Sequence, residues 1–288
     1  MLGVTGAGGQ LGRLVVGELL ERVDAARIVG LSHSPERLDD LPIASRQADF
    51  ADRDGLVKAF DNLDGLLIIS LPPLPERGTL QANAVAAAAT AGISHLVYTS
   101  FTRAGEPGNP VSVVPEHRET ERLIAESGLP STVLRFNMWP QMLMMLGTAP
   151  GAAAKGMLLS NAGDGRVAYV TREDSAAVAA AALADGLAIG ELLEVSGPAA
   201  VSDAELAAIL SEVAGTPVRH QDADDDTALS AWLADGLPER YAQALVANGQ
   251  ARRDGWYELT GHAVQRLTGK PPTQLADFLI THRDELVS

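Results

Sequence analysis

Residues 1–12 read MLGVTGAGGQLG, a short apolar strand followed by a glycine-rich turn and the start of a helix near Gln10. Gly6, Gly9 and Gly12 recur at every third position. This spacing predicts a tight turn at Gly6, close approach of a ligand to the backbone at Gly9, and close packing of helix on strand at Gly12. Backbone N–H groups and a helix N-terminus then meet in one place, which favours a pyrophosphate. We predict a dinucleotide site made by Gly6, Ala7, Gly8, Gly9, Gln10, Leu11 and Gly12; a plain glycine-rich turn is the alternative.

Strand-like and helix-like patterns alternate after this turn. Apolar runs at 27–32, 66–70, 95–100 and 131–136 are separated by helical patterns at 11–23, 52–60, 80–91 and 116–128. The runs lack polar alternation, which indicates strands buried on both faces by helices. The sequence therefore predicts an α/β fold, a Rossmann-type doubly wound parallel sheet with a smaller C-terminal α/β lobe for the substrate.

The pattern loosens after Asn137. A Met-rich segment, a Gly/Ala-rich stretch at 148–155 and an expected hairpin around GDG at 163–165 precede helical segments from Asp203 to the end. The acidic run DADDD at 222–226 is interpreted as a solvated loop or a helix start. We expect residues 1–136 and 167–195 to form the dinucleotide-binding domain, and residues 137–166 and 196–288 to form the substrate lobe.

Composition narrows the classes of partner and compartment. The 288 residues are 46% hydrophobic and carry a net charge of −15, which disfavours nucleic acid and anionic membrane surfaces. No cysteine is present, so disulfides and thiolate chemistry are excluded. No apolar run reaches the roughly 20 residues of a membrane span, and no signal-peptide pattern is seen. We expect a cytoplasmic protein with a small-molecule substrate; the oligomeric state stays open.

The end of the second predicted strand selects the dinucleotide. Residues 30–37 read GLSHSPER, where an NAD-binding chain would place an acid against the ribose 2′-hydroxyl. Ser32, His33, Ser34 and Arg37 stand there instead, and they can donate to a 2′-phosphate. We therefore predict a preference for NADP(H), with NAD(H) left open; Glu36 weakens the argument because it can neutralise Arg37.

Several segments resemble one known family. The GAGGQLG start, SHSPER at 32–37, QADFAD at 47–52, PEHRETERLIAESGLPSTVLR at 115–135 and NAGDGRVAYVTRED at 161–174 are similar to NmrA-like atypical short-chain dehydrogenases, especially type 2 NAD(P)H:quinone oxidoreductases and triphenylmethane-dye reductases. The resemblance implies a Rossmann domain with a substrate lobe that binds NADPH without flavin. It also implies that Asp49 and Phe50 border the adenine, and that Ile69, Ser70 and Leu71 run beneath the nicotinamide. Family members commonly carry arginine at the position of His33.

Catalytic residues are harder to place. Ordinary short-chain dehydrogenases use a Tyr-x-x-x-Lys pair, whereas residues 113–122 read VVPEHRETER and contain neither residue. By resemblance, His117 occupies an active-site position, where an imidazole bonds the nicotinamide ribose or relays a proton. A solvent-exposed histidine on a polar helix is the alternative.

Side chains that follow two predicted strands complete the expected site. Ser100 and Phe101 follow one strand, and Asn137, Met138 and Trp139 follow the next, at carboxyl ends where open α/β sheets bind ligands. We assign Ser100 with His117 to catalysis and Asn137 to the cofactor, and we expect Phe101, Met138, Trp139 and Met142 to line a pocket for a flat apolar acceptor. Met144 and Met145 suit the pocket or simple core packing. No metal-ligand motif is found, so we expect no metal.

Two classes of function follow. The first is an enzyme in which NADPH delivers a hydride to a quinone or a similar conjugated or aromatic carbonyl, which needs little acid catalysis because its product anion is delocalised. A ketoreductase or enoyl reductase acting on a larger metabolite belongs to the same class. The second is an NADP(H)-binding redox sensor without turnover, which is the kind of regulator that NmrA itself resembles. The retained His117 and the apolar residues after Arg135 favour the enzyme.

Overall fold

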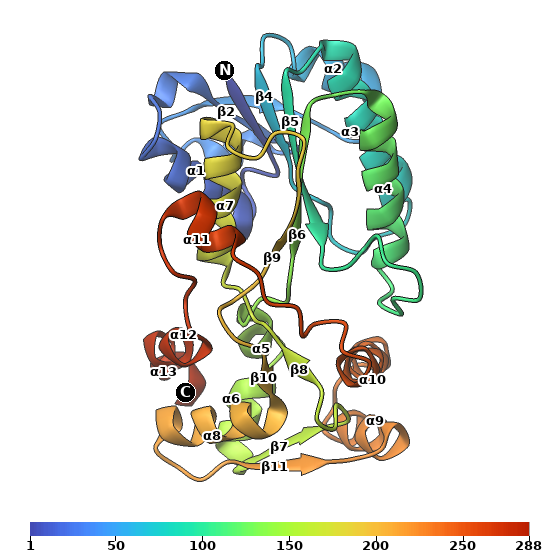
Figure 1. Cartoon of the computed structure of the whole chain (residues 1–288), viewed down its shortest axis with the longest axis vertical. Coiled ribbons are helices and arrows are strands. Elements are labelled where there is room, and N and C mark those ends of the chain that lie inside the picture. The colour runs from blue at the N-terminus through green and yellow to red at the C-terminus, as the bar shows by residue number, and fades with distance from the viewer. Residues whose placement is uncertain (288) are drawn as a thin grey trace.

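A seven-stranded parallel sheet dominates the computed structural model, which describes residues 1–287 (Figure 1). Its strands lie in the order β3-β2-β1-β4-β5-β6-β9, so the order reverses at β1. Their bounds are β1 Leu2–Thr5, β2 Ile28–Ser32, β3 Ala44–Gln47, β4 Gly65–Ile68, β5 His95–Phe101, β6 Ser131–Phe136 and β9 Leu192–Val195. Open α/β sheets bind ligands at the carboxyl edge beside such a reversal. The predicted fold class is confirmed.

Helices cover both faces of the sheet (Figure 1). One face carries α1 (Gln10–Leu20), α7 (Arg172–Asp185) and α11 (Ala263–Thr268), and the other carries α2 (Arg53–Ala59), α3 (Arg77–Ala91) and α4 (Val114–Ser127). Alanine-rich sequence lets α3 and α7 approach their neighbours closely, and nine residues of α7 are buried. Two short 3₁₀ turns, Ala25–Arg27 and Pro35–Leu38, flank β2. Burial on both sides explains why the strands carry continuous apolar runs.

A smaller lobe lies at the carboxyl edge of the sheet (Figure 1). Its strand pairs are β7 (Met157–Ser160) with β11 (Arg219–Asp222), parallel, and β8 (Arg166–Val167) with β10 (Val201–Ser202), antiparallel. Its helices are α5 Gln141–Met145, α6 Thr148–Lys155, α8 Asp203–Ala214, α9 Asp225–Ala234, α10 Glu239–Arg253, α12 Leu275–Thr281 and α13 Arg283–Val287. The lobe has its own apolar core, which includes Leu158, Leu210 and Phe278. The α11 segment, expected in the lobe, lies against α7 and β9 of the larger part.

The prediction of a hairpin around residues 163–165 is wrong. The strands that flank this turn pair with distant strands, β7 with β11 and β8 with β10. The turn instead packs on α10. A Cβ at Gly165 would lie only 2.4 Å from the backbone carbon of Arg252, so glycine is needed for this contact. Of the two interpretations of the acidic run, the helix start is confirmed for its second half: Asp222 ends β11, and Asp224 caps α9 by accepting from the Thr227 N–H at 2.7 Å.

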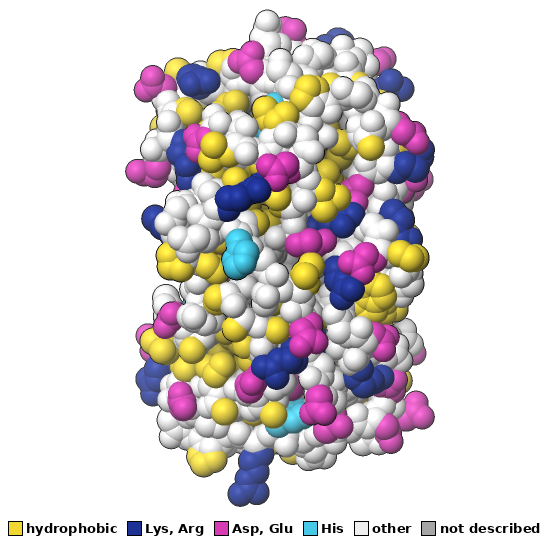
Figure 2. Space-filling model, in the orientation of Figure 1, with side chains coloured by type: hydrophobic (Ala, Val, Ile, Leu, Met, Phe, Trp, Pro, Cys, Tyr) yellow, Lys and Arg dark blue, Asp and Glu magenta, His cyan; other side chains and the backbone are white. Residues whose placement is uncertain are grey.

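The visible surface mixes both signs of charge. Acidic and basic side chains are interspersed over the face shown in Figure 2, with no broad basic patch. No helix among residues 1–287 is both long and apolar enough to cross a membrane. Within the same residues, no three His, Cys, Asp or Glu side chains gather as a metal site.

Candidate functional site

The glycine turn, residues 6–12, forms what we call the phosphate cradle. Gly6 has a φ of +61°, and its carbonyl accepts a hydrogen bond from the Gly9 N–H at 2.9 Å. A Cβ at Gly12 would lie 2.2 Å from the Gly6 oxygen, so only glycine allows this approach of helix to turn. Gly9 is the N-cap of α1 and supplies no side-chain acceptor to the first turn. Backbone donors and the positive helix end are therefore available to an anion, and the cradle fits a pyrophosphate.

The end of β2 lies beside this cradle. A Cβ at Gly8 would lie 3.7 Å from the Cβ of Arg37 and 3.8 Å from the Ser32 hydroxyl. Ser32 and Ser34 hold each other in a turn, because the Ser34 N–H donates to the Ser32 hydroxyl at 3.1 Å. Among residues 1–287, the exposed Arg37 side chain has no hydrogen bond or ion pair, and Glu36 does not neutralise it. A free guanidinium therefore stands next to the turn.

His33 and the pair Asp49 and Phe50 lie near this end. The His33 side chain is 75% exposed, and its Nε2 is 3.9 Å from an Asp49 carboxylate oxygen. Phe50 is buried, and its carbonyl accepts from the Asn83 amide at 3.0 Å. β2 and the segment after β3 are joined by a bond from the Ala48 N–H to the Ser32 carbonyl. The contact of Asp49 and Phe50 with adenine stays a prediction.

Residues 69–71 follow β4 and are fixed by side chains of neighbouring elements. The N–H groups of Ile69, Ser70 and Leu71 donate to Thr5 Oγ1 at 3.0 Å, Thr99 Oγ1 at 2.8 Å and Gln81 Oε1 at 3.2 Å. A Cβ at Gly6 would lie 3.8 Å from the Ile69 Cβ, which places this strand end beside the cradle.

His117 lies on α4 and is buried, not exposed on a polar helix face. Arg77 Nη2 is 2.8 Å from its Nε2, and the Tyr98 hydroxyl is 2.9 Å from its Nδ1. A guanidinium only donates, so Nε2 accepts and Nδ1 carries the proton. Burial, with the Arg77 charge, lowers the pKa of His117 to about 3. The imidazole is therefore neutral at pH 7, and both ring nitrogens are engaged by protein groups.

Arg77 was not singled out by the sequence. It is 1% exposed, and it joins three elements: Nε donates to the Leu71 carbonyl at 2.7 Å, Nη1 to Glu116 at 2.8 Å, and Nη2 to His117. It connects the segment after β4 to α4. A lone arginine at the start of an alanine-rich helix carries no motif, so its role is visible only when α3 and α4 are packed together.

Ser100 contacts a different group of side chains. Its hydroxyl donates to Glu121 at 2.5 Å, and Glu121 accepts from Arg135 at 2.6 and 2.9 Å. Arg135 also lies 3.3 Å from Glu194, whose pKa is raised by burial. No hydrogen bond joins Ser100 to His117 in residues 1–287. The two residues assigned to catalysis thus belong to separate networks.

The expected pocket residues divide between two cores. Phe101 packs near His117, with ring centroids 6.1 Å apart, and edge-on against Tyr257, and with Met138 it contacts the lobe core. Trp139 packs on the sheet core and donates to the Ser175 hydroxyl at 3.0 Å; Met142 lies near the Arg172 guanidinium. The buried Asn137 amide donates to the Tyr257 carbonyl at 3.0 Å, so it ties β6 to the segment after α10.

Residues 6–186 match the NAD(P)H-binding family. Quinone oxidoreductase 2 of Escherichia coli is 32% identical over 280 residues, which cover 96% of each chain. A (4-alkanoyl-5-oxo-2,5-dihydrofuran-3-yl)methyl phosphate reductase of Streptomyces griseus is 34% identical over 288 residues, covering 99% of this chain and 98% of that protein.

Solved structures give the same result. The E. coli quinone oxidoreductase with NADPH superposes with a TM-score of 0.91 at 32% identity, covering 98% of this chain and 99% of the other. The Citrobacter triphenylmethane reductase with NADP(H) superposes with a TM-score of 0.90 at 30% identity, covering 98% and 100%. This chain therefore belongs to the NAD(P)H-binding family and is an oxidoreductase, as the sequence resemblance implies.

Proposed function

We propose that this enzyme passes a hydride from NADPH directly to a quinone or a related conjugated or aromatic carbonyl, without a flavin. The observation that carries the proposal is the state of His117. Its Nε2 accepts from Arg77, and its pKa near 3 leaves it without a proton to give at Nε2 at neutral pH. An acceptor whose reduced anion is stable in water fits such a site.

The chain's own residues suit NADPH. The phosphate cradle would hold the pyrophosphate, and Arg37 with Ser32 would meet the 2′-phosphate, since the guanidinium has no partner within residues 1–287. Residues 69–71 would support the nicotinamide side. When bound, NADPH supplies a hydride, and the protein orients it and excludes water.

The acceptor class follows from proton supply. A simple ketone becomes an alkoxide on hydride addition and needs an acid within hydrogen-bond reach. A quinone becomes a delocalised anion that solvent can protonate later. Relatives of this chain carry the names quinone oxidoreductase and triphenylmethane reductase, which supports a flat conjugated acceptor.

The test is oxidation of NADPH by the purified protein against a quinone, an enone, a triarylmethane dye and a simple ketone. We expect turnover with the quinone and a slower rate with NADPH deuterated at the transferred position. Added flavin should change nothing, and the ketone should react at least 100-fold more slowly, the scale of general acid catalysis. A flavin requirement would refute direct transfer. NADPH binding without turnover on any acceptor would point to the sensor.

A further inference from the structure

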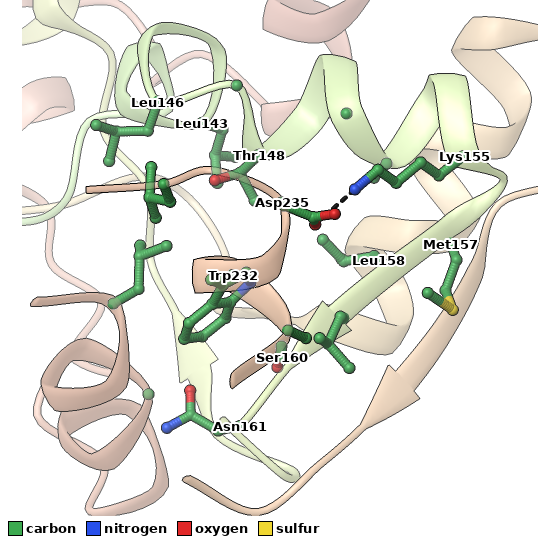
Figure 3. Close-up of a pocket in the computed structure, with 18 of the residues that line it drawn as sticks. Leu143, Leu146, Thr148, Lys155, Met157, Leu158, Ser160, Asn161, Trp232 and Asp235 are labelled. Carbon is green, nitrogen blue, oxygen red and sulfur yellow. Dashed lines mark hydrogen bonds and ion pairs between the residues drawn. The ribbon is translucent and has the colours of Figure 1, made fainter. Parts of the chain in front are cut away.

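A pocket of about 780 Å³ lies inside the lobe, between α5, α6, β7, α9 and α10 (Figure 3). None of the residues predicted to hold the dinucleotide lines it. Its walls are mainly apolar and include Leu143, Leu158, Trp232 and Leu245. The volume falls within the range of about 300–1,000 Å³ that small-molecule sites have.

Asn161 places an unpaired acceptor at this pocket. It is 2% exposed, and its Nδ2 donates to an Asp225 carboxylate at 2.8 Å and to the Val246 carbonyl at 3.0 Å. Both partners are acceptors, so the amide orientation is fixed. Its Oδ1 has no partner in residues 1–287, and Figure 3 shows this oxygen directed toward Trp232.

Two unpaired donors accompany this acceptor. Arg252 lines the pocket; its Nη1 donates to both Asp203 oxygens at 2.9 Å and its Nε to Asn248, while Nη2 has no partner in the described part of the chain. Trp232 also lines the pocket, and its indole N–H has no hydrogen-bond partner in the described part of the chain. Apolar walls with a few convergent polar atoms that lack partners are typical of ligand sites.

The charges of the lining side chains indicate which polar group of a ligand this pocket can accept. Four charged side chains line the pocket and form two internal pairs, Lys155 with Asp235 at 2.5 Å and Arg252 with Asp203. The two pairs cancel, so a carboxylate or an ammonium would enter without a counter-charge, at a desolvation cost. An uncharged oxygen can accept from Arg252 or Trp232, and a hydroxyl can also donate to Asn161.

We propose that the lobe pocket binds a small amphipathic molecule with a hydrocarbon body and an uncharged hydroxyl or carbonyl head group. The body lies against the leucines and Trp232, and the head group meets Asn161 and Arg252. The site is separate from the phosphate cradle, so binding does not require NADPH.

Gly151 allows the pocket to be filled without disturbing the fold. It lies in α6 and lines the pocket, and a Cβ built there has no heavy atom within 4 Å. Gly151→Leu therefore places a side chain in the open volume and favours the helix. Gly17→Leu is the matched control, because Gly17 lies in α1, is exposed and is equally free of neighbours.

The experiment is calorimetry with 1-decanol, followed by decanoate of the same chain length. We expect 1-decanol to bind the parent and Gly17→Leu equally, Gly151→Leu to bind at least tenfold more weakly, and NADPH affinity to be the same in all three. Decanoate should bind the parent more weakly than 1-decanol. The proposal is overturned if a folded Gly151→Leu binds 1-decanol like the parent, or if the parent gives no heat. If decanoate binds the parent more tightly than 1-decanol does, the proposal that the head group is uncharged is overturned.

Discussion

Replacement of Arg37 by alanine tests the assignment of the 2′-phosphate site with little cost to the fold. The Arg37 side chain is exposed and makes no hydrogen bond or ion pair in residues 1–287, so its removal leaves no buried group without a partner. Its backbone carbonyl still accepts from Arg13, which is paired with Asp40. Any loss of affinity then reports the contact with the ligand.

The expected loss follows from the strength of one charge-assisted contact. A guanidinium bonded to a phosphate contributes about 1.5–3 kcal/mol, and each 1.36 kcal/mol is tenfold in affinity. NADPH should therefore bind Arg37→Ala roughly 10- to 150-fold more weakly. The lower end applies at physiological salt, because exposed charges are screened there. NADH lacks the 2′-phosphate, so its affinity should change less than about threefold.

The measurement is titration calorimetry of both dinucleotides at fixed ionic strength. Arg27→Ala is the control, because Arg27 is also exposed and lies just before β2, at the amino end of the strand that Arg37 follows. We expect the control to bind both dinucleotides like the parent. A parent that binds NADPH and NADH equally, or an Arg37→Ala variant that loses both alike, would refute the assignment.

Three further predictions concern the cradle and His117. Gly9→Val should abolish NADPH binding in a folded protein, because its Cβ would lie 3.2 Å from the Gly6 carbonyl and its methyl groups would occupy the phosphate position; unchanged calorimetric affinity would contradict the cradle. Gly12→Ala should lower the free energy of unfolding by at least about 2 kcal/mol, because its Cβ would lie 2.2 Å from backbone, whereas Gly17→Ala should be neutral or stabilising by up to about 1 kcal/mol; denaturant titration compares the two. His117→Gln should flatten the loss of stability between pH 6.5 and 5. Because the folded pKa of His117 is near 3 and the unfolded value near 6.5, the unfolded chain alone gains a proton as the pH falls, and the parent loses up to about 1.4 kcal/mol per pH unit; equal slopes in parent and variant would contradict the buried neutral imidazole.

The larger part of the fold was predictable because its signals are local. The strand runs and the glycine turn each lie within a few neighbouring residues, and burial on both faces makes the runs continuous. No apolar run predicts β3 (Ala44–Gln47), because this edge strand is mostly exposed and its sequence is polar. The 163–165 turn misled for a different reason: strand pairing in the lobe joins segments that are about 35 to 60 residues apart, which no short pattern specifies.

The candidate site divides in the same way. The shape of the glycine turn and its place beside the end of β2 were predictable from residue types at fixed spacing, whereas the dinucleotide contacts of these residues stay predictions. The surroundings of His117 were not, because Arg77, Tyr98 and His117 come from α3, β5 and α4 and meet only in the folded chain. Ser100 is assigned to catalysis from its place at the end of a predicted strand, and His117 from the family resemblance. The structure instead gives the Ser100 hydroxyl to Glu121.

The Arg77 contact also determines what a variant at His117 can reveal. An alanine at position 117 would leave the Arg77 Nη2 group and the Tyr98 hydroxyl buried without their His117 partner, at a cost of about 1–3 kcal/mol each. Because Arg77 also holds the Leu71 carbonyl, a lower activity of that variant could come from lost catalysis or from movement of the backbone at residue 71. His117→Gln keeps an acceptor for Arg77 and a donor for Tyr98 but does not titrate. If His117 only positions the segment after β4, the glutamine variant should keep quinone turnover within about tenfold and an unchanged pH profile. If His117 instead donates a proton in turnover, His117→Gln should be as slow as His117→Ala. The dependence of the parent's rate on pH that comes from His117 should then be absent in His117→Gln.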